Sequence, residues 1–464
     1  MFTFKHGVLL HDYHKRRTEA KEIRLADLPA KVILPLQQNL GCPAESLVKV
    51  GDVVLEGQKI ADSSKLISVP VHASISGKVT AIEKMPNPCG YDVVSVVIEG
   101  DGDDSRNSKV EILPAGRQGR NSKTENGTPD EIRKIVREAG IVGLGGAAFP
   151  THVKLLPPAD KKIDTVIING CECEPYVTAD HRIMLERTGD IIFGAQAIAK
   201  AVGAQRIIVG VEENKKDAWE KMKFEILPAG RQGRNSKFEI NPNNQIPIQI
   251  ILIKTKYPQG GEKMLIKALL KREVPSRGLP SDIGVLVQSV GTAAAIAEAI
   301  KFNQPLTQRV VTVTGGGVRE PQNLLARVGT PFIDLINQSG GLTEDAAKVI
   351  MGGPMMGIAL SSFDFPIVKA TNSILVLRKS EVRNYEESPC IRCGRCIKAC
   401  PMGLTPNFIA DAAKLKDWDQ AGEYNVADCI ECGCCSYVCP ARIYLVQYFK
   451  TAKYELQTRR AVCS

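Results

Sequence analysis

The stretch 390-CIRCGRCIKACP-401 returns later in the chain as 429-CIECGCCSYVCP-440. Both runs have the spacing C-x-x-C-x-x-C-x-x-x-C-P. In tandem runs of this type, three thiolates hold one 4Fe–4S cluster and the fourth ligates the other cluster. We therefore predict two 4Fe–4S clusters in a helical domain of the bacterial-ferredoxin type over residues 378–464.

The crossed pattern predicts one ligand set for each cluster. The set for cluster 1 is Cys390, Cys393, Cys396 and Cys439. The set for cluster 2 is Cys429, Cys432, Cys435 and Cys400. Structural zinc is the alternative, but zinc sites usually pair two separated C-x-x-C units rather than repeat a run of four cysteines. Cys434 breaks the spacing, so we predict no ligand role for it.

The two runs also differ in charge. Arg392, Arg395 and Lys398 lie in the first run, whereas Asp428 and Glu431 flank the second. Positive charge favours the reduced, more negative state of a cluster. Cluster 1 is therefore predicted to have the higher reduction potential.

The composition is that of a folded, globular chain of several domains. It has 464 residues, of which 44% are hydrophobic and 24% charged, a balance that excludes disorder and fibrous repeats. Ten of the 14 cysteines lie between 390 and 463, and no secretory signal precedes them, so we expect reduced thiols or metal ligands rather than disulfides. No stretch reaches the ~18 uncharged apolar residues of a membrane span, so we expect neither export nor a membrane span.

Part of the net charge of +9 has a local source. The segment EILPAGRQGRNSK occurs at 111–123 and again at 225–237. Each copy holds two Arg, one Lys and one Glu, a net of +2, so the pair supplies +4 of the +9. We interpret the copies as surface-loop insertions, with a regulatory or binding role as the alternative, and expect no nucleic-acid partner.

Residues 32–100 alternate apolar and polar positions between glycine turns, which predicts a small antiparallel β unit. The pattern V-x-A-x-x-x-G-x-V at 71–79 resembles the half-motif of lipoyl and biotinyl barrel-sandwich domains. Those carriers have a modified lysine at the hairpin tip, where this chain has Ser74, Ile75 and Ser76. We therefore predict an unmodified barrel-sandwich unit over 1–100.

A capped helix opens the central part of the chain. Thr128 can cap it, Pro129 suits its first position and Glu131 completes a capping box. Apolar strands then alternate with helical stretches up to about residue 305, which indicates βαβ units and a parallel sheet. We predict a linker over 101–127, a Rossmann-like α/β domain over 128–305 and a small α+β unit over 306–377.

Three loops of the central domain have the composition of a ligand site. The glycine-rich loop 140-GIVGLGGAAFPT-151 follows a helix and not a strand, so it is no Rossmann fingerprint. Its glycines still permit close approach to a phosphate or a flat ring, although an irregular tight loop explains them equally well. The loops 169-NGCECEP-175 and 257-YPQGGEK-263 follow apolar strands, where a parallel sheet has its ligand crevice.

Together, these segments resemble the C subunit of the Rnf ferredoxin:NAD oxidoreductases and, more distantly, the flavoprotein subunit of respiratory complex I. GLGGAAFPTHVK, NGCECEPYVTADHR and YPQGGEKML match the flavin and nucleotide loops of that family in order. TVTGGGVREPQNLL matches its β-grasp segment, which implies an SLBB-type domain over 306–377. The complex I flavoprotein has a single C-terminal cluster, so the double cysteine run favours the Rnf family.

The resemblance also implies roles for single residues. The residues that would cradle flavin mononucleotide (FMN) are Gly143, Gly145, Gly146 and Lys154, with Asn169 and Glu172 in contact with the flavin and Gly260 behind it. The residues that would meet NAD(H) are Phe149, Glu174 and Glu262. This chain departs from complex I at Cys171, where complex I has an aspartate, and at Gly261, where it has a glutamate.

The implied function is that of a peripheral subunit of a membrane-bound, ion-translocating ferredoxin:NAD oxidoreductase on the cytoplasmic side of the bacterial inner membrane. Its implied partners are the other subunits, including a ferredoxin-like iron–sulfur subunit. Nicotinamide exchanges electron pairs and a cluster accepts single electrons, so a flavin is the required converter. The alternatives are a cobalamin reductase of a bacterial microcompartment and a non-enzymatic adaptor with structural clusters.

Overall fold

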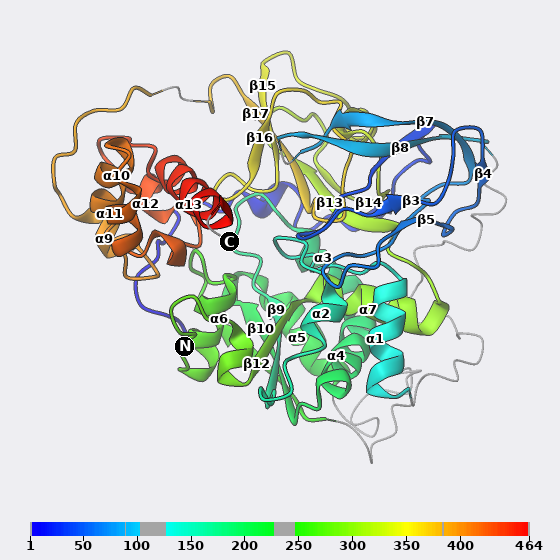
Figure 1. Ribbon diagram of the computed structural model, residues 1–464, viewed down its shortest axis with the longest axis horizontal. Coiled ribbons are helices and arrows are strands. Elements are labelled where there is room, and N and C mark those ends of the chain that lie inside the picture. The colour runs from blue at the N-terminus through cyan, green and yellow to red at the C-terminus, as the bar shows by residue number, and fades with distance from the viewer. Residues whose placement is uncertain (1, 89, 103–126, 227–245, 383–384, 463–464) are drawn as a thin grey trace.

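The computed structural model describes residues 2–88, 90–102, 127–226, 246–382 and 385–462 (Figure 1). The first duplicated segment, 111–123, lies outside the described residues. Of the second, only Glu225 and Ile226 at the end of a helix are described. Figure 1 shows a β-rich part above an α/β domain, with a helical lobe to one side.

The N-terminal β unit consists of two antiparallel sheets, as the alternating pattern predicts. One sheet has the order β2 (Lys31–Pro35), β8 (Asp92–Gly100), β7 (Gly77–Pro86), β4 (Val53–Val54). The other has β3 (Glu45–Ser46), β5 (Lys59–Asp62) and β6 (Val71–His72). The apolar positions of the 71–79 pattern are buried in the core between them. Gly77 is required there, because a Cβ would lie 2.0 Å from the Glu99 carbonyl oxygen.

The central domain has the predicted parallel sheet. Its order is β11 (Ile248–Ile253), β10 (Arg206–Glu212), β9 (Thr165–Gly170), β12 (Val285–Ser289). Its helices are α1 (Pro129–Glu138), α2 (Thr151–Lys154), α3 (Ala179–Glu186), α4 (Thr188–Val202), α5 (Lys216–Glu225), α6 (Glu262–Leu270) and α7 (Val290–Phe302), with 3-10 turns η3 (Glu213–Lys215) and η5 (Pro280–Ile283). The capping box at Thr128 and Glu131 is confirmed.

The region after residue 306 forms the predicted α+β unit around a six-stranded sheet. Its order is β1 (Ile23–Leu25), β14 (Gln322–Arg327), β13 (Gln308–Thr314), β17 (Ser373–Arg378), β15 (Ala346–Met351), β16 (Ile358–Leu360), and α8 (Phe332–Gln338) packs against it. β15 and β16 pair as an antiparallel hairpin. The sequence pattern does not predict that β1, which precedes the barrel-sandwich strands, completes one edge of this sheet.

The C-terminal lobe is helical, as predicted. Its elements are α9 (Arg395–Ala399), α10 (Pro406–Lys414), α11 (Trp418–Glu423), η6 (Val426–Asp428), α12 (Cys434–Tyr437) and α13 (Leu445–Val462). Ile409, Val426 and Phe449 are in its apolar core together with several cysteines. None of the helices in the described ranges is both long and apolar enough to cross a bilayer.

The first 25 residues connect the domains to one another. The Gly7 N–H donates to the Ala399 carbonyl in the helical lobe at 3.1 Å. After the turn η1 (Lys15–Arg17), the Thr18 carbonyl accepts a hydrogen bond from the Asn323 side chain at 2.9 Å. Strand β1 follows on the β-grasp sheet. This N-terminal segment therefore contacts regions that are distant from it in sequence.

Candidate functional site

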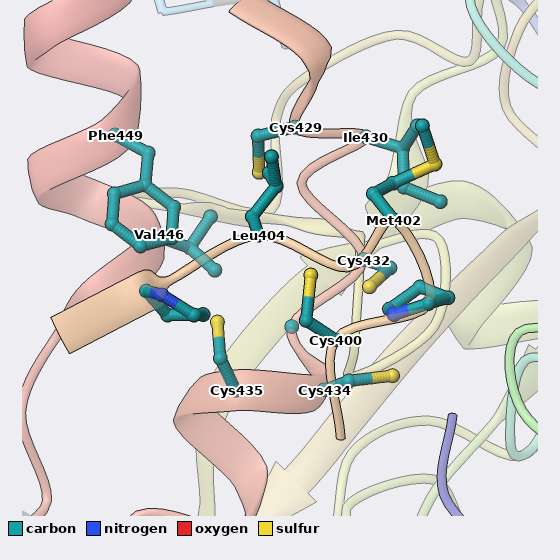
Figure 2. Close-up of a pocket in the computed structure, with 13 residues that line it drawn as sticks. Cys400, Met402, Leu404, Cys429, Ile430, Cys432, Cys434, Cys435, Val446 and Phe449 are labelled. Atoms are coloured by element: carbon teal, nitrogen blue, oxygen red, sulfur yellow. The ribbon is translucent and has the colours of Figure 1, made fainter. Parts of the chain in front are cut away.

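Four cysteines from both runs converge on one cavity of the helical lobe. Cys429, Cys432 and Cys435 line about 330 Å³ of space together with Cys400. Figure 2 shows these four sulfurs turned toward a common space, while the sulfur of Cys434 is turned away from it. The structure thus brings together the four residues that the spacing predicts for cluster 2.

The other four cysteines line a second cavity of about 390 Å³: Cys390, Cys393, Cys396 and Cys439. Each cavity therefore combines three cysteines of one run with the fourth cysteine of the other. This crossed arrangement is the one that two 4Fe–4S clusters require, whereas zinc sites usually pair two separated C-x-x-C units. No disulfide joins any two of the described cysteines.

The glycine-rich loop lies at the carboxyl end of β12. The Gly143 N–H donates to the Phe149 carbonyl at 2.9 Å, which closes the loop at its base. Gly145 and Gly146 are exposed at its tip. A Cβ on Gly145 would lie 2.9 Å from the Cβ of Ser289, so the loop packs on the β12–α7 junction only with a glycine at that position.

Lys154 and Glu262 form an ion pair beside the end of β12. The Lys154 ammonium donates to Glu262 Oε1 at 3.0 Å and to the Val287 carbonyl at 2.7 Å. The resemblance assigns the first residue to FMN and the second to the nucleotide, and the structure brings them into contact. The charge of Lys154 is therefore already partly neutralised by a carboxylate.

The other two loops lie against each other. The Asn169 side chain donates to the Gly260 carbonyl at 2.8 Å and accepts from the Cys171 N–H at 3.0 Å. A Cβ on Gly260 would lie 2.0 Å from the Cys171 carbonyl oxygen, so only glycine fits there. The three residues therefore form one rigid corner at the end of β9.

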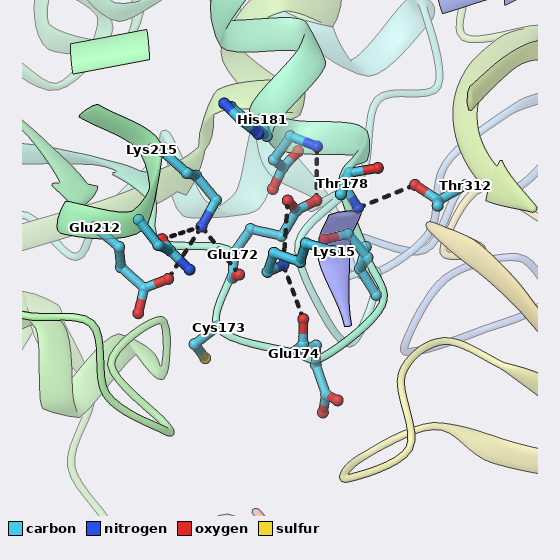
Figure 3. A network of polar contacts seen from close by, with 12 residues as sticks. Lys15, Glu172, Cys173, Glu174, Thr178, His181, Glu212, Lys215 and Thr312 are labelled. Atoms are coloured by element: carbon cyan, nitrogen blue, oxygen red, sulfur yellow. Dashed lines mark hydrogen bonds and ion pairs between the residues drawn. The ribbon is translucent and has the colours of Figure 1, made fainter. Parts of the chain in front are cut away.

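Glu172 points into a buried charge network, which Figure 3 shows. Its Oε1 accepts from the Asp180 N–H at 2.8 Å, and the Lys15 ammonium lies 3.6 Å from its Oε2. The Lys215 ammonium donates to the Glu172 carbonyl at 3.2 Å. Lys15 comes from the N-terminal segment, so no local sequence signal could identify it as a neighbour of this loop.

Glu174 faces the β-grasp domain. Its carboxylate accepts from the Met355 N–H at 3.2 Å and the Met356 N–H at 2.8 Å, and burial raises its pKa to about 7. The Tyr257 hydroxyl lies 3.4 Å from the same carboxylate and donates to the Cys432 carbonyl at 2.7 Å. The loop region of the α/β domain is thus in direct contact with the cavity predicted for cluster 2.

The β12–α7 junction contributes residues that the sequence analysis missed. Gln288 is buried, and its Nε2 has no hydrogen-bond partner among the described residues. Thr292 accepts from the Leu144 N–H at 2.9 Å, and Ser289 caps α7. A buried, unpaired donor beside a glycine loop fits a polar ligand such as FMN. The signal was the polar pair Gln-Ser at the end of the apolar strand GVLVQSV.

Four family models match successive parts of the chain. They are an RnfC barrel sandwich hybrid domain at 2–103, a Nuo51 FMN-binding domain at 136–298, an SLBB domain at 310–359 and a 4Fe-4S dicluster domain at 383–440. The matches confirm the fold class predicted from the sequence, with a barrel-sandwich unit, a flavin domain, a β-grasp domain and a two-cluster domain.

Known relatives are similar over nearly the whole chain. The C subunit of the proton-translocating ferredoxin:NAD(+) oxidoreductase complex of Clostridium ljungdahlii is 46% identical over 98% of this chain and 94% of its own length. The C subunit of the Na(+)-translocating complex of Acetobacterium woodii is 43% identical over 99% and 98%. The C subunit of the ion-translocating oxidoreductase complex of Rhodobacter capsulatus is 40% identical over 98% and 83%.

Proposed function

The chain belongs to the family of the C subunits of ion-translocating ferredoxin:NAD(+) oxidoreductase complexes, and from this premise we propose which of its residues hold the cofactors. It is an oxidoreductase subunit with an FMN-binding domain and a 4Fe–4S dicluster domain, and it transfers electrons between NAD(H), FMN and the clusters. FMN, when bound, exchanges electron pairs with NAD(H) and single electrons with the clusters.

The flavin crevice is formed by the three loops at the carboxyl ends of the parallel strands. The glycine loop accommodates FMN through Gly143, Gly145 and Gly146, with Lys154 beside it. Asn169, Glu172 and Gly260 hold the opposite side, where the Asn169–Gly260 hydrogen bond supports a fixed corner. The residues assigned to NAD(H) are Phe149, Glu174 and Glu262. The orphaned Gln288 amide supports a polar ligand in this crevice.

The two cysteine sets have different positions along the electron path. The set Cys400, Cys429, Cys432 and Cys435 holds cluster 2, and the Tyr257–Cys432 hydrogen bond supports its place next to the flavin crevice. The set Cys390, Cys393, Cys396 and Cys439 holds cluster 1. The exposure of Cys393 supports a place for cluster 1 at the side that exchanges electrons with a partner.

The chain is one component of a multi-subunit complex. We propose that it binds peripherally on the cytoplasmic side of the bacterial cell membrane and that a ferredoxin-like iron–sulfur subunit is its electron partner. Co-purification from membranes of tagged wild-type chain tests this placement. Recovery of the chain from the soluble fraction without any iron–sulfur partner would contradict it.

The observation that carries the proposal is the hydrogen bond from Tyr257 of the α/β domain to the Cys432 carbonyl, which joins the loops of that domain to a cavity lined by thiols, with a second such cavity in the same lobe. The test is the visible spectrum of anaerobically prepared chain before and after NADH addition, together with flavin and iron analysis. We expect about eight iron atoms, one flavin and bleaching of both chromophores by NADH. Iron without flavin, or a spectrum that NADH leaves unchanged, would refute the flavin site.

A further inference from the structure

Two buried cations of the β-grasp domain form hydrogen bonds with the glycine loop. Arg309 lies on β13, and Lys369 lies in the turn that precedes β17. Their exposed fractions are 7% and 1%. Neither residue belongs to the FMN-binding segment 136–298. Both therefore come from a different domain than the loop they contact.

Their hydrogen bonds end on the backbone of the loop. The Lys369 ammonium donates to the Gly140 carbonyl at 2.7 Å and to the Pro70 carbonyl of the barrel-sandwich unit at 2.8 Å. The Arg309 guanidinium donates to the Leu144 carbonyl at 3.3 Å and, through its other terminal nitrogen, to the Lys369 carbonyl. The two cations thus donate hydrogen bonds to two carbonyl groups of the glycine loop, one on each side of Gly143.

Neither cation forms an ion pair with a described carboxylate. Burial lowers the pKa of Lys369 to about 7 and that of Arg309 to about 10, while Asp180 opposes the second shift from a distance. Burial and the charge of Lys369 lower the pKa of His72 to about 3, so this neighbour is neutral. Asp180 offsets the burial of Arg309 only in part, and no described carboxylate pairs with Lys369, so an anion at the loop would further compensate this positive charge.

Lys154 contributes less positive charge at the loop, because Glu262 already accepts its hydrogen bond. The exposed tip at Gly145 and Gly146 follows directly on Leu144, whose carbonyl accepts the hydrogen bond from Arg309. Backbone amides of a glycine loop bind phosphate best where the surrounding field is positive. The cations are in position to supply that field.

We propose that Arg309 and Lys369 are positioning residues that hold the glycine loop and attract the phosphate of FMN. The β-grasp domain thereby takes part in flavin binding without touching the isoalloxazine ring. This inference rests on the proposed function, since it requires FMN in the crevice. It adds that phosphate affinity depends on residues outside the flavin domain.

The test compares FMN with riboflavin, which lacks the phosphate. Flavin-free chain is titrated anaerobically with each ligand, and binding is followed by flavin fluorescence. For Arg309→Met and Lys369→Met we expect FMN affinity to fall about tenfold, with riboflavin affinity nearly unchanged. Arg309→Lys should restore most of the FMN affinity. A role in packing alone would weaken both ligands equally.

Arg327→Met is the matched control. Arg327 is also a buried cation of the β-grasp domain, but it pairs with Glu56 of the barrel-sandwich unit and does not contact the glycine loop. Its FMN-to-riboflavin affinity ratio should equal that of wild type, and thermal unfolding of each variant identifies any loss of fold. If Arg309→Met does not fold, an unchanged ratio in Lys369→Met would overturn the inference alone. Wild-type chain that binds neither flavin would overturn the proposed flavin site and the inference with it.

Discussion

The two cysteine cavities have the same ligand spacing and different surroundings. Cys400, Cys432 and Cys435 are buried, and their cavity adjoins the α/β domain through Tyr257 and through the Arg277 N–H, which donates to Asp428 at 2.9 Å. At the other cavity, Cys393 is exposed. The repeat therefore determines which residues can bind a cluster, while domain docking determines which cluster lies next to the flavin crevice.

The charge contrast between the cavities is smaller than the sequence indicates. Arg392 pairs with Asp411 at 3.0 Å, so part of the positive charge at cluster 1 is cancelled. Glu431 pairs with Lys453 at 2.7 Å, which cancels part of the negative charge at cluster 2. The predicted order of the reduction potentials remains a prediction, and we expect the gap to be modest.

The largest expected effect comes from removing a ligand of the buried cavity. Cys432→Ser should abolish cluster 2 and interrupt the path between the flavin and cluster 1. We expect the rate at which NADH reduces cluster 1, measured by rapid-freeze EPR, to fall substantially. The fall should exceed the roughly 10–100-fold loss that follows removal of a residue hydrogen-bonded to a metal ligand.

Cys434→Ser is the control, because Cys434 lines the same cavity but its sulfur does not point into the space shared by the other four. It should retain both clusters and near wild-type reduction kinetics. If the two serine variants lose cluster 2 equally, the predicted ligand set is wrong. If neither loses it, the cavity does not bind a cluster through Cys432.

A smaller effect is expected from reversing charge at the exposed cavity. Arg392→Glu combined with Arg395→Glu should lower the midpoint potential of cluster 1 by roughly tens of millivolts, since negative charge opposes electron uptake. The midpoint of cluster 2 should move much less. Redox titration with EPR detection measures both, and an unmoved midpoint for cluster 1 would show that charge does not distinguish the two sites.

The smallest effect, on stability, is expected at Glu387, which lies shortly before Cys390 of the exposed cavity in the chain. Glu387 accepts from the Tyr444 N–H, the Lys414 ammonium at 3.0 Å and the Tyr448 hydroxyl at 3.0 Å. Glu387→Gln should cost about 1 kcal/mol or less of unfolding free energy, because the site is partly solvated. Chemical denaturation of the holo-protein measures this loss.

The effect of Glu387 should also depend on pH. Burial acts to raise the pKa of Glu387, but the hydrogen bonds from Tyr444, Lys414 and Tyr448 lower it overall. A lowered folded-state pKa means that the stabilisation is complete above the unfolded value of about 4.3. It is lost as the pH falls through the folded-state value. A wild-type and Glu387→Gln difference that persists below both values would contradict this account.

The sequence predicts best where structure is local. The cysteine spacing groups Cys390 with Cys393 and Cys396 because short runs have few ways to arrange three thiolates. The parallel sheet and the capped helix at Thr128 likewise follow from patterns within single elements. These features need no knowledge of distant contacts.

The remaining features depend on contacts between distant parts of the chain. Lys15 lies beside Glu172, and Arg309 beside Leu144, only because separate domains dock. Their sequence surroundings are those of ordinary surface cations, and burial becomes evident only in the folded chain. A site role for Gln288 could have been predicted from the sequence, because a polar residue at the end of an apolar strand of a parallel sheet indicates a ligand crevice.

The N-terminal segment has a consequence for biosynthesis. A ribosome releases Gly7 and Thr18 early, whereas their hydrogen-bond partners Ala399 and Asn323 emerge hundreds of residues later. Contacts of such long sequence separation form late and slow the final step of folding. The segment with Gly7 and Thr18 must therefore wait for its partners, so maturation should finish only after the helical lobe that receives iron has been translated.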